Sequence, residues 1–152
     1  MSKKVSFPTV SLNEVPKAVS QNGYKPIVLV VDDESIIADT LAEILSRSGY
    51  TAIAEYDGDS ALETALLMPP EMVITDVVLP GMSGIELAIT IRRIFPDCKI
   101  ILFSGQASTA DLLAAARQDG HQFTLLNKPL HPTDLLARVS EVLKTRQHTA
   151  AV

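Results

Sequence analysis

Short apolar runs alternate along this chain with longer segments whose apolar residues recur at helical spacing. The runs occupy residues 27–31, 51–55, 72–75, 99–103 and 123–126. A brief apolar run bounded by turn residues is typical of a strand covered on both faces, and the segments between the runs supply the crossovers that parallel strands require. The alternation therefore predicts an α/β fold, with a five-stranded parallel sheet and helices on both of its faces.

Turn-forming and capping residues mark the ends of the expected helices. Ser83 and Glu86 are spaced as a capping box, in which each side chain accepts a hydrogen bond from the other residue's backbone. The remaining expected boundaries are a helix end near Gly49, helix starts at Asp57, Ser108 and Pro132, and a helix end at Gly120.

The length of 152 residues suits one domain, since domains run to about 100–200 residues. Residues 1–25 hold prolines, asparagines and scattered apolar side chains without periodicity, which indicates a poorly ordered N-terminal arm. Apolar side chains such as Phe7 and Leu12 leave docking of this arm on a surface open. The domain is expected over residues 26–145, followed by a tail at 146–152 and by no output domain.

Charge and hydropathy exclude several classes of protein. The net charge of −5 argues against non-specific binding to nucleic acid, which depends on basic patches. No apolar run approaches the roughly 18 residues of a membrane span, and no secretory signal begins the chain, so we expect a soluble, cytoplasmic protein. The single cysteine, Cys98, forms no intrachain disulfide, and we expect it to be buried and inert.

Chemically active side chains follow four of the five predicted strands. They are Asp32, Asp33 and Glu34 after the first strand, Asp76 after the third, Ser104 after the fourth, and Asn127 and Lys128 after the fifth. In an open parallel sheet, ligands bind beyond the carboxyl ends of the strands. These residues are therefore expected on one edge of the sheet.

Carboxylates gathered at one edge repel each other unless a cation joins them. Oxygen ligands without His or Cys favour Mg²⁺ over zinc. A competing interpretation is that residues 32–34 only cap the first helix, where negative charge is favourable. Asp76 beside a metal ion could act as a nucleophile toward phosphorus, while Lys128 and Ser104 could stabilise the transferring phosphoryl group.

Four separated motifs resemble the receiver domains of response regulators. They lie at residues 30–34 (VVDDE), 74–84 (ITDVVLPGMSG), 103–105 (FSG) and 127–130 (NKPL), and the match runs in order from about Ile27 to Lys144. The resemblance implies a flavodoxin-like sheet with strand order 2-1-3-4-5.

The resemblance also implies a role for each residue of one site. These are Asp76 as phosphoacceptor and metal ligand, Asp33 and Asp32 as metal-binding acids, the Val78 backbone carbonyl as a further ligand, Lys128 and Ser104 as phosphoryl-binding groups, Ser104 and Leu125 at the switch positions, and Pro129 as a candidate for a cis peptide bond. The implied cofactor is Mg²⁺.

The implied function is a signalling switch rather than an enzyme, since such a domain catalyses only its own phosphorylation and dephosphorylation. The phosphoryl group would come from a phosphohistidine on a sensor histidine kinase or a histidine phosphotransfer protein. The output would be an unidentified protein partner, a phosphorelay step or a homodimer.

Two departures from the family affect the expected output surface. Many receivers carry Tyr or Phe where this chain has Leu125, and a leucine cannot reproduce the rotation of that ring. Residues 120–123 also differ from the usual start of the fifth strand, and His121 within them is expected to be solvated. These departures motivate an alternative function, a constitutive protein-interaction domain that is not phosphorylated in the cell.

A phosphatase and a nucleotide-binding fold fit the residues less well. A phosphatase of the haloacid dehalogenase type needs a second Asp two residues after its nucleophile, and that position here is Val78. A nucleotide-binding fold needs a glycine-rich loop after a strand, and none of the predicted strands is followed by one.

Overall fold

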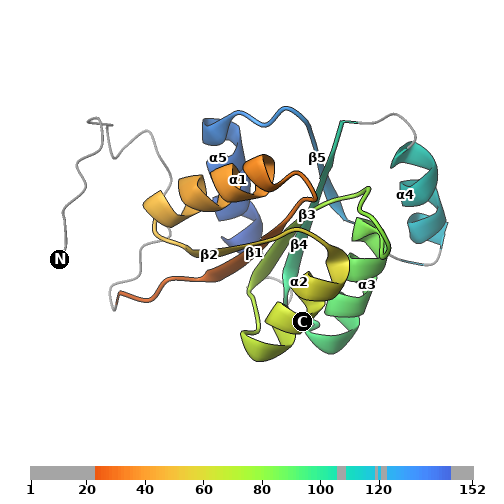
Figure 1. The fold of residues 1–152 in the computed structure, drawn as a ribbon, viewed down its shortest axis with the longest axis horizontal. Helices are drawn as coiled ribbons and strands as arrows, with labels where there is room; N and C mark the ends of the chain where they lie inside the picture. Colours follow the sequence, from red (N-terminus) through yellow and green to blue (C-terminus); the bar gives the residue numbers. More distant parts are fainter. Residues whose placement is uncertain (1–22, 106–108, 119, 121–122, 145–152) are drawn as a thin grey trace.

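The computed structural model describes residues 23–105, 109–118, 120 and 123–144. Strands and helices alternate along the described chain (Figure 1). The strands are β1 (Ile27–Val31), β2 (Thr51–Glu55), β3 (Met72–Asp76), β4 (Lys99–Ser104) and β5 (Thr124–Asn127). The helices are α1 (Ser35–Arg47), α2 (Gly58–Leu67), α3 (Gly84–Ile94), α4 (Thr109–Gln118) and α5 (Pro132–Lys144).

The strands form one parallel sheet in the order β2-β1-β3-β4-β5. This order confirms the expected flavodoxin-like topology. The sequence steps from β1 to β2 on one side and from β1 to β3, β4 and β5 on the other, so the direction of winding reverses at β1 and β3. The carboxyl edge beside such a reversal is where ligands bind in open α/β sheets.

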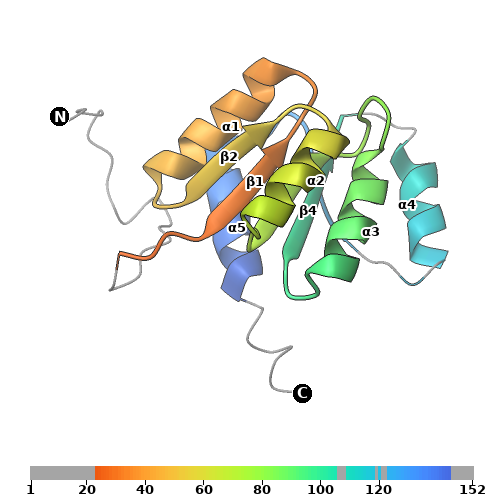
Figure 2. The same cartoon turned by 60° about the horizontal axis from the view of Figure 1, so that its bottom comes forward.

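Helices cover both faces of the sheet, as Figure 2 shows. Successive side chains of a strand point to opposite faces, so each central strand contributes to two cores. Val28 and Val30 pack with residues of α1 and α5, such as Leu45 and Leu135. The alternate residues of β1 pack on the other face with α2, α3 and Ala116 of α4. The apolar runs are continuous because both faces of the central strands are buried.

The capping predictions are confirmed where the structure describes them. The Ser83 side chain accepts a hydrogen bond from the Glu86 backbone, and the Glu86 side chain accepts one from the Ser83 backbone. Asp57 caps α2 by accepting from the Ser60 N–H at 2.7 Å. Gly49 follows α1 with a φ of 102°, where a side chain would be strained. The predicted cap Ser108 lies outside the described residues, as do His121, residues 1–22 of the predicted arm and the predicted tail at 146–152.

Three strands extend one residue beyond their apolar runs, to Asp76, Ser104 and Asn127. Asp76 pairs with Phe103, and Ser104 pairs with Asn127. Pairing joins backbone groups, so a polar side chain does not end a ladder that its backbone can continue. The fifth strand also begins at Thr124 rather than at the predicted residue 123, because its ladder with β4 starts at Thr124.

Candidate functional site

The carboxyl edge of the sheet brings together Asp32, Asp76 and Lys128. Asp32 directly follows β1, Asp76 ends β3, and Lys128 directly follows β5. The residue two positions before each of them packs in the core beneath α1 and α5. Because side chains alternate with a period of two, all three are directed toward that same face of the sheet.

The acidic residues predicted to bind a metal lie close together. Asp32, Asp33 and Asp76 each offer one carboxylate oxygen, and these three oxygens lie within 4.8 Å of one another. Asp32 is fully buried and Asp76 is only 8% exposed, whereas Asp33 is open to solvent. Two carboxylates thus come from the protein interior and one from its surface, which leaves an open side for a ligand.

The Asp32 carboxylate is incompletely satisfied by the protein. Its Oδ1 accepts the Glu34 N–H at 2.9 Å, but its buried Oδ2 receives no hydrogen bond of acceptable geometry. The Lys128 amine lies 3.0 Å from Oδ2, so the contact there is electrostatic. A buried oxygen without an aligned donor, next to two more carboxylates, fits a hard divalent cation such as Mg²⁺.

Lys128 bridges the two buried carboxylates. Its Nζ donates a hydrogen bond to Asp76 Oδ2 at 3.0 Å and lies equally close to Asp32. Its backbone N–H donates to the Ser104 carbonyl at 3.0 Å, and the Lys128–Pro129 peptide bond is cis. Lys128 follows β5, and its amine reaches across the end of β4 to the carboxyl edge of β3.

Burial and ion pairing oppose each other at this site. Burial raises the pKa of Asp76 above its ordinary value and the charge of Asp32 raises it further, while Lys128 lowers it by hydrogen bonding and charge. For Lys128, burial alone would lower the pKa, but the contacts with Asp32 and Asp76 outweigh burial and raise it. One ammonium group does not fully compensate the buried negative charge of Asp76.

Ser104 and Val78 lie next to this centre, whereas Leu125 lies in the middle of β5, two strands away from Asp76. Ser104 is 4% exposed and ends the strand next to Asp76, one residue beyond the Phe103 position that pairs with Asp76. The Val78 N–H lies 3.3 Å from Asp76 Oδ1, and its side chain is 39% exposed. Leu125, in the middle of β5, is also 39% exposed and pairs with Leu102, whose side chain lies in the core beneath α2 and α3.

Gly84 is a contributor to the site whose role was not anticipated from the sequence. A Cβ at this position would lie 1.8 Å from the Asp76 carbonyl oxygen, far inside van der Waals contact. The Gly84 N–H donates to the Val77 carbonyl at 2.8 Å, which draws the start of α3 against the end of β3. Its sequence signals were its place directly after the predicted cap Ser83 and at the end of the receiver-like motif at residues 74–84.

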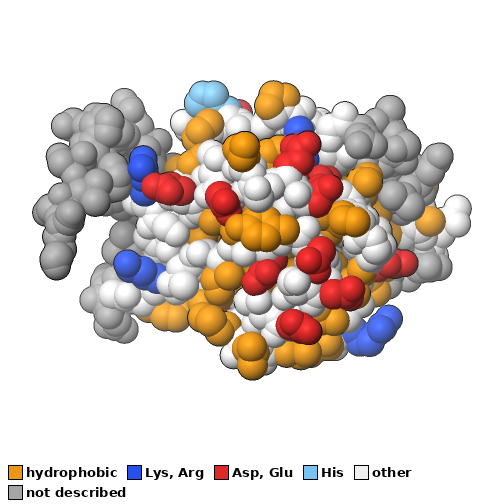
Figure 3. All heavy atoms as spheres, viewed as in Figure 1, with side chains coloured by type: hydrophobic (Ala, Val, Ile, Leu, Met, Phe, Trp, Pro, Cys, Tyr) orange, Lys and Arg blue, Asp and Glu red, His pale blue; other side chains and the backbone are white. Residues whose placement is uncertain are grey.

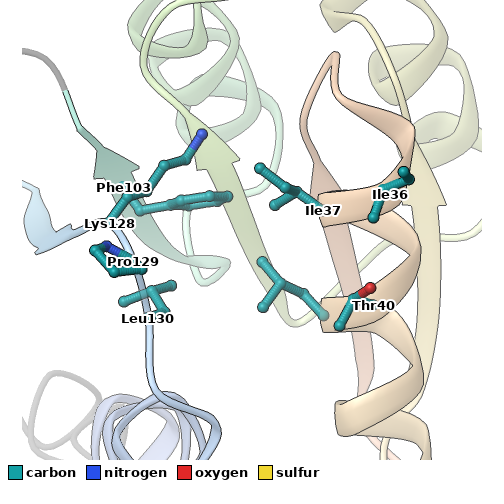
Figure 4. A pocket seen from close by; sticks show the side chains of 8 residues that line it. Ile36, Ile37, Thr40, Phe103, Lys128, Pro129 and Leu130 are labelled. Carbon is teal, nitrogen blue, oxygen red and sulfur yellow. The ribbon is translucent and has the colours of Figure 1, made fainter.

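Phe103 is a second unanticipated contributor. Its ring centroid lies 5.0 Å from Lys128 Nζ, and its side chain is buried. Figure 4 shows the ring beneath the amine end of Lys128, with Ile37 of α1 facing it across a pocket. In the sequence, Phe103 was the last residue of the apolar run at 99–103 and the first residue of the motif at 103–105.

The interpretation that residues 32–34 only cap the first helix does not account for this arrangement. Glu34 occupies the cap position of α1, but its side chain makes no capping hydrogen bond, and no acidic residue lies in the first turn. Asp32 does accept from the Glu34 backbone and so shapes the turn into α1. One of its carboxylate oxygens also lies within 4.8 Å of an oxygen of Asp33 and an oxygen of Asp76.

Comparison with known families agrees with this geometry. The sequence model of the response regulator receiver domain family matches residues 28–140, which is most of the chain. The chain belongs to the response regulator receiver family. The matched region runs from Val28 in β1 into α5 and contains every residue of the candidate site.

Solved receiver structures share the fold. A two component transcriptional regulator AraC from Clostridium phytofermentans ISDg is 28% identical, with a TM-score of 0.68, covering 84% of this chain and 100% of that chain. A CheY-like receiver domain protein from Methanospirillum hungatei JF-1 is 26% identical, with a TM-score of 0.72, covering 83% and 99%. NtrX from Brucella abortus is 28% identical, with a TM-score of 0.74, covering 84% of this chain but 29% of NtrX.

Membership of the receiver family gives the chain a general place in signalling. Receiver domains are the phosphoacceptor domains of two-component systems, and they work with histidine kinases or phosphotransfer proteins. Among the described residues, none of the helices has the length and apolar character needed to cross a membrane.

Proposed function

We propose that this receiver domain, residues 26–145, is a switch in which Asp76 accepts a phosphoryl group from a phosphohistidine of a partner kinase or phosphotransfer protein. The observation that carries the proposal is the position of Lys128 Nζ, 3.0 Å from both Asp76 and Asp32. The Lys128 ammonium group at this position would contact the oxygens of a phosphoryl group that is transferred to Asp76. Structural ion pairs gain nothing from a third carboxylate, whereas a phosphoryl-transfer site requires the metal that Asp33 helps to hold.

The protein would promote phosphoryl transfer mainly by positioning the reacting groups and stabilising their charge. One Asp76 carboxylate oxygen forms a bond to phosphorus as the phosphorus–nitrogen bond to the donor imidazole breaks in line. The bonding electron pair returns to the imidazole nitrogen, which takes up a proton. Charge on the transferring oxygens is stabilised by Lys128 and by the Ser104 hydroxyl.

Mg²⁺ is the proposed cofactor, held by Asp32, Asp33, Asp76 and the Val78 backbone carbonyl. When bound, it would neutralise charge on the carboxylates and on the phosphoryl oxygens. Asp32 and Asp33 would hold the ion, and the Val78 N–H, 3.3 Å from Asp76 Oδ1, orients the nucleophile. The burial that raises the pKa of Asp76 makes this carboxylate receptive to a cation.

The proposed test is phosphorylation by a small donor. Wild-type protein incubated with Mg²⁺ and phosphoramidate gains the mass of one phosphoryl group, as measured by intact mass spectrometry. Asp76→Ala gains none, while Asp97→Ala, which removes an exposed carboxylate beyond the amino end of β4, is labelled like wild type. Labelling of Asp76→Ala, or an unchanged mass for wild type, would remove the basis of the proposal.

The exposed Leu125 favours one alternative, a constitutive interaction domain. It is 39% exposed and has no ring to transmit the state of Ser104. If this alternative holds, a binding partner has equal affinity for wild type and Asp76→Ala, with and without phosphoramidate. The switch predicts instead that phosphoramidate changes the affinity of wild type alone, or its elution in size-exclusion chromatography if the output is a homodimer.

A further inference from the structure

The Phe103 ring and the Lys128 amine form a contact that the proposed function does not yet use. The amine lies 5.0 Å from the ring centroid, within the roughly 6 Å over which an aromatic face attracts a cation. Phe103 is 1% exposed, so water competes little for the underside of the amine. The ring therefore forms a fixed, weakly attractive floor below the cation (Figure 4).

The backbone ties this floor to the phosphoacceptor. Phe103 pairs with Asp76 across β3 and β4, and the Val77 N–H donates to the Phe103 carbonyl at 3.1 Å. The two side chains stand next to each other on the same face of the sheet. A displacement of one strand end moves both residues together, so the distance from ring to carboxylate is well defined.

The Phe103 ring adds a third contact to an amine that already lies 3.0 Å from Asp32 Oδ2 and from Asp76 Oδ2. The amine makes an aligned hydrogen bond with Asp76 Oδ2 only, and its contact with Asp32 Oδ2 is electrostatic without alignment. A lysine side chain has several rotatable bonds and binds as a point charge, so one hydrogen bond does not fix its direction. The ring limits movement away from the carboxylates.

The space on the other side of the ring shows why an aromatic residue is needed. A pocket of about 280 Å³ lies between α1 and the segment after β5, and its lining includes Ile37, Leu41, Phe103, Pro129 and Leu130. Lys128 lines this pocket as well, next to the Phe103 ring. A side chain shorter than that of Phe103 would leave the stem of Lys128 next to open apolar space into which it could fold.

We propose that Phe103 is a positioning residue that holds the Lys128 amine over the Asp76 oxygen at which the phosphoryl group arrives. The inference rests on the proposed phosphoacceptor function and adds to it a residue that acts through Lys128. It requires that the effect of Phe103 on phosphoryl transfer depends on the amine, while the binding of Mg²⁺ by the carboxylates does not depend on the ring.

A double-mutant cycle tests this requirement. Phe103→Leu is compared with its parent in the wild-type and the Lys128→Met backgrounds, and the rate of phosphorylation by phosphoramidate is followed by intact mass. In the wild-type background we expect a rate about 2- to 30-fold lower, which corresponds to about 0.5–2 kcal/mol for a cation over an aromatic face. In the Lys128→Met background, Phe103→Leu changes the rate less than 2-fold, since no cation remains to be held.

Three further measurements separate positioning from general damage to the core. Phe103→Tyr keeps the ring and restores most of the rate. Phe95→Leu, the same substitution at the partly buried end of α3, leaves the rate unchanged. The Mg²⁺ dissociation constant of Phe103→Leu, measured by calorimetry, stays within about 2-fold of wild type. An equal rate loss in both Lys128 backgrounds, or no loss in either, overturns the inference.

An independent measurement distinguishes failure of this inference from failure of the proposed function. In protein labelled with ¹³C-lysine, the Lys128 Cε–H signals are shifted upfield by the ring of Phe103, and Phe103→Leu removes that shift while Phe103→Tyr keeps it. If wild type accepts no phosphoryl group, the proposed function falls, and the NMR shift still decides whether the ring holds the amine. A Lys128 signal that is the same in wild type and Phe103→Leu overturns the inference even when phosphorylation is normal.

Discussion

Asp76 is the side chain at which stability and the proposed function oppose each other. It is 8% exposed, and burial raises its pKa above the ordinary value despite the adjacent Lys128. A group whose pKa is raised in the folded state binds its proton more tightly there than in the unfolded chain. Ionisation of Asp76 therefore costs stability, and this cost appears as the pH rises through its folded pKa.

Replacing Asp76 by Asn is expected to stabilise the protein at neutral pH in the absence of divalent ions. The neutral amide keeps the shape of the side chain and removes the buried charge, while Lys128 retains its contact with Asp32. The advantage of Asp76→Asn should shrink as the pH falls below the Asp76 pKa, because the wild-type group is then neutral as well. Urea unfolding at several pH values measures this, and a destabilised variant at neutral pH would refute it.

Mg²⁺ should reverse this order of stability. An ion that binds only the folded state at a concentration a hundredfold above its dissociation constant adds about 2.7 kcal/mol to the free energy of unfolding. Wild type should gain this increment, and Asp76→Asn should gain less because one ligand charge is lost. Thermal unfolding in a Mg²⁺ titration, with Asp97→Ala as the control, tests the prediction. Equal gains for wild type and Asp76→Asn would show that Asp76 is not a ligand.

Gly84 controls the position of Asp76 through backbone contact. Gly84→Ala would place a methyl group 1.8 Å from the Asp76 carbonyl oxygen, so the start of α3 must move. We expect a loss of about 2 kcal/mol or more in the free energy of unfolding, together with slower phosphorylation. Gly105→Ala is the matched control, since its Cβ would meet Lys128 at an ordinary 3.5 Å and should cost less than about 0.5 kcal/mol. Denaturant unfolding of both variants gives the comparison, and similar values would contradict it.

Among the helices, α3 combines a strong cap with direct contact to the site. Ser83 and Glu86 satisfy each other's backbone donors at its start, next to Gly84. Ser83→Ala should lower the free energy of unfolding by about 1 kcal/mol, the usual cost of losing such a cap. Ser46→Ala, at an exposed position in the last turn of α1, should change it little. Urea unfolding distinguishes the two, and an unaffected Ser83→Ala would mean that the cap contributes no net stability.

The strands and helices could be predicted from the sequence because each is encoded locally. The run at residues 27–31 is apolar on both faces, and Ser83 with Glu86 defines a helix start without reference to the rest of the chain. The placement of Asp32, Asp76 and Lys128 on one edge followed from parallel topology alone. Strand ends were less accurate, because the ladder continues through Asp76 and Ser104 on backbone hydrogen bonds that their side chains do not reveal.

The contacts around the site could not be predicted from the sequence because they join residues that are distant in the chain. Gly84 is required by a carbonyl that belongs to another element, and nothing in its neighbours indicates that approach. Phe103 appears in the sequence as the end of an apolar run. Its position beside the pocket depends on how α1 and the segment after β5 pack. The unaligned second oxygen of Asp32 is likewise a product of side-chain packing.

The charge of the domain is distributed unevenly between its elements. Residues 32–63, which comprise the carboxylates after β1 together with α1, β2 and α2, hold nine acidic residues and one basic residue, a net charge of −8 against −5 for the entire chain. Figure 3 shows Asp and Glu side chains spread over the viewed surface, with most Lys and Arg side chains near its margins. Tyr56 moderates the repulsion locally by donating a hydrogen bond to Asp39 at 2.6 Å.

Repulsion among the acidic side chains of residues 32–63 should make the stability of the domain depend on salt concentration. Raising the ionic strength from about 0.01 M to about 0.1 M shortens the Debye length from about 30 Å to about 10 Å, which screens exposed like charges from one another. The free energy of unfolding of wild type should therefore rise. Glu63→Lys, at an exposed position of α2, should add a few tenths of a kcal/mol at the lower ionic strength and less at the higher one. Asp97→Lys, a reversal outside residues 32–63, should give a smaller gain at low salt. Urea unfolding of the three proteins at both ionic strengths measures these differences. Equal gains for the two variants would show that repulsion among the acidic residues of 32–63 does not lower the stability of the domain.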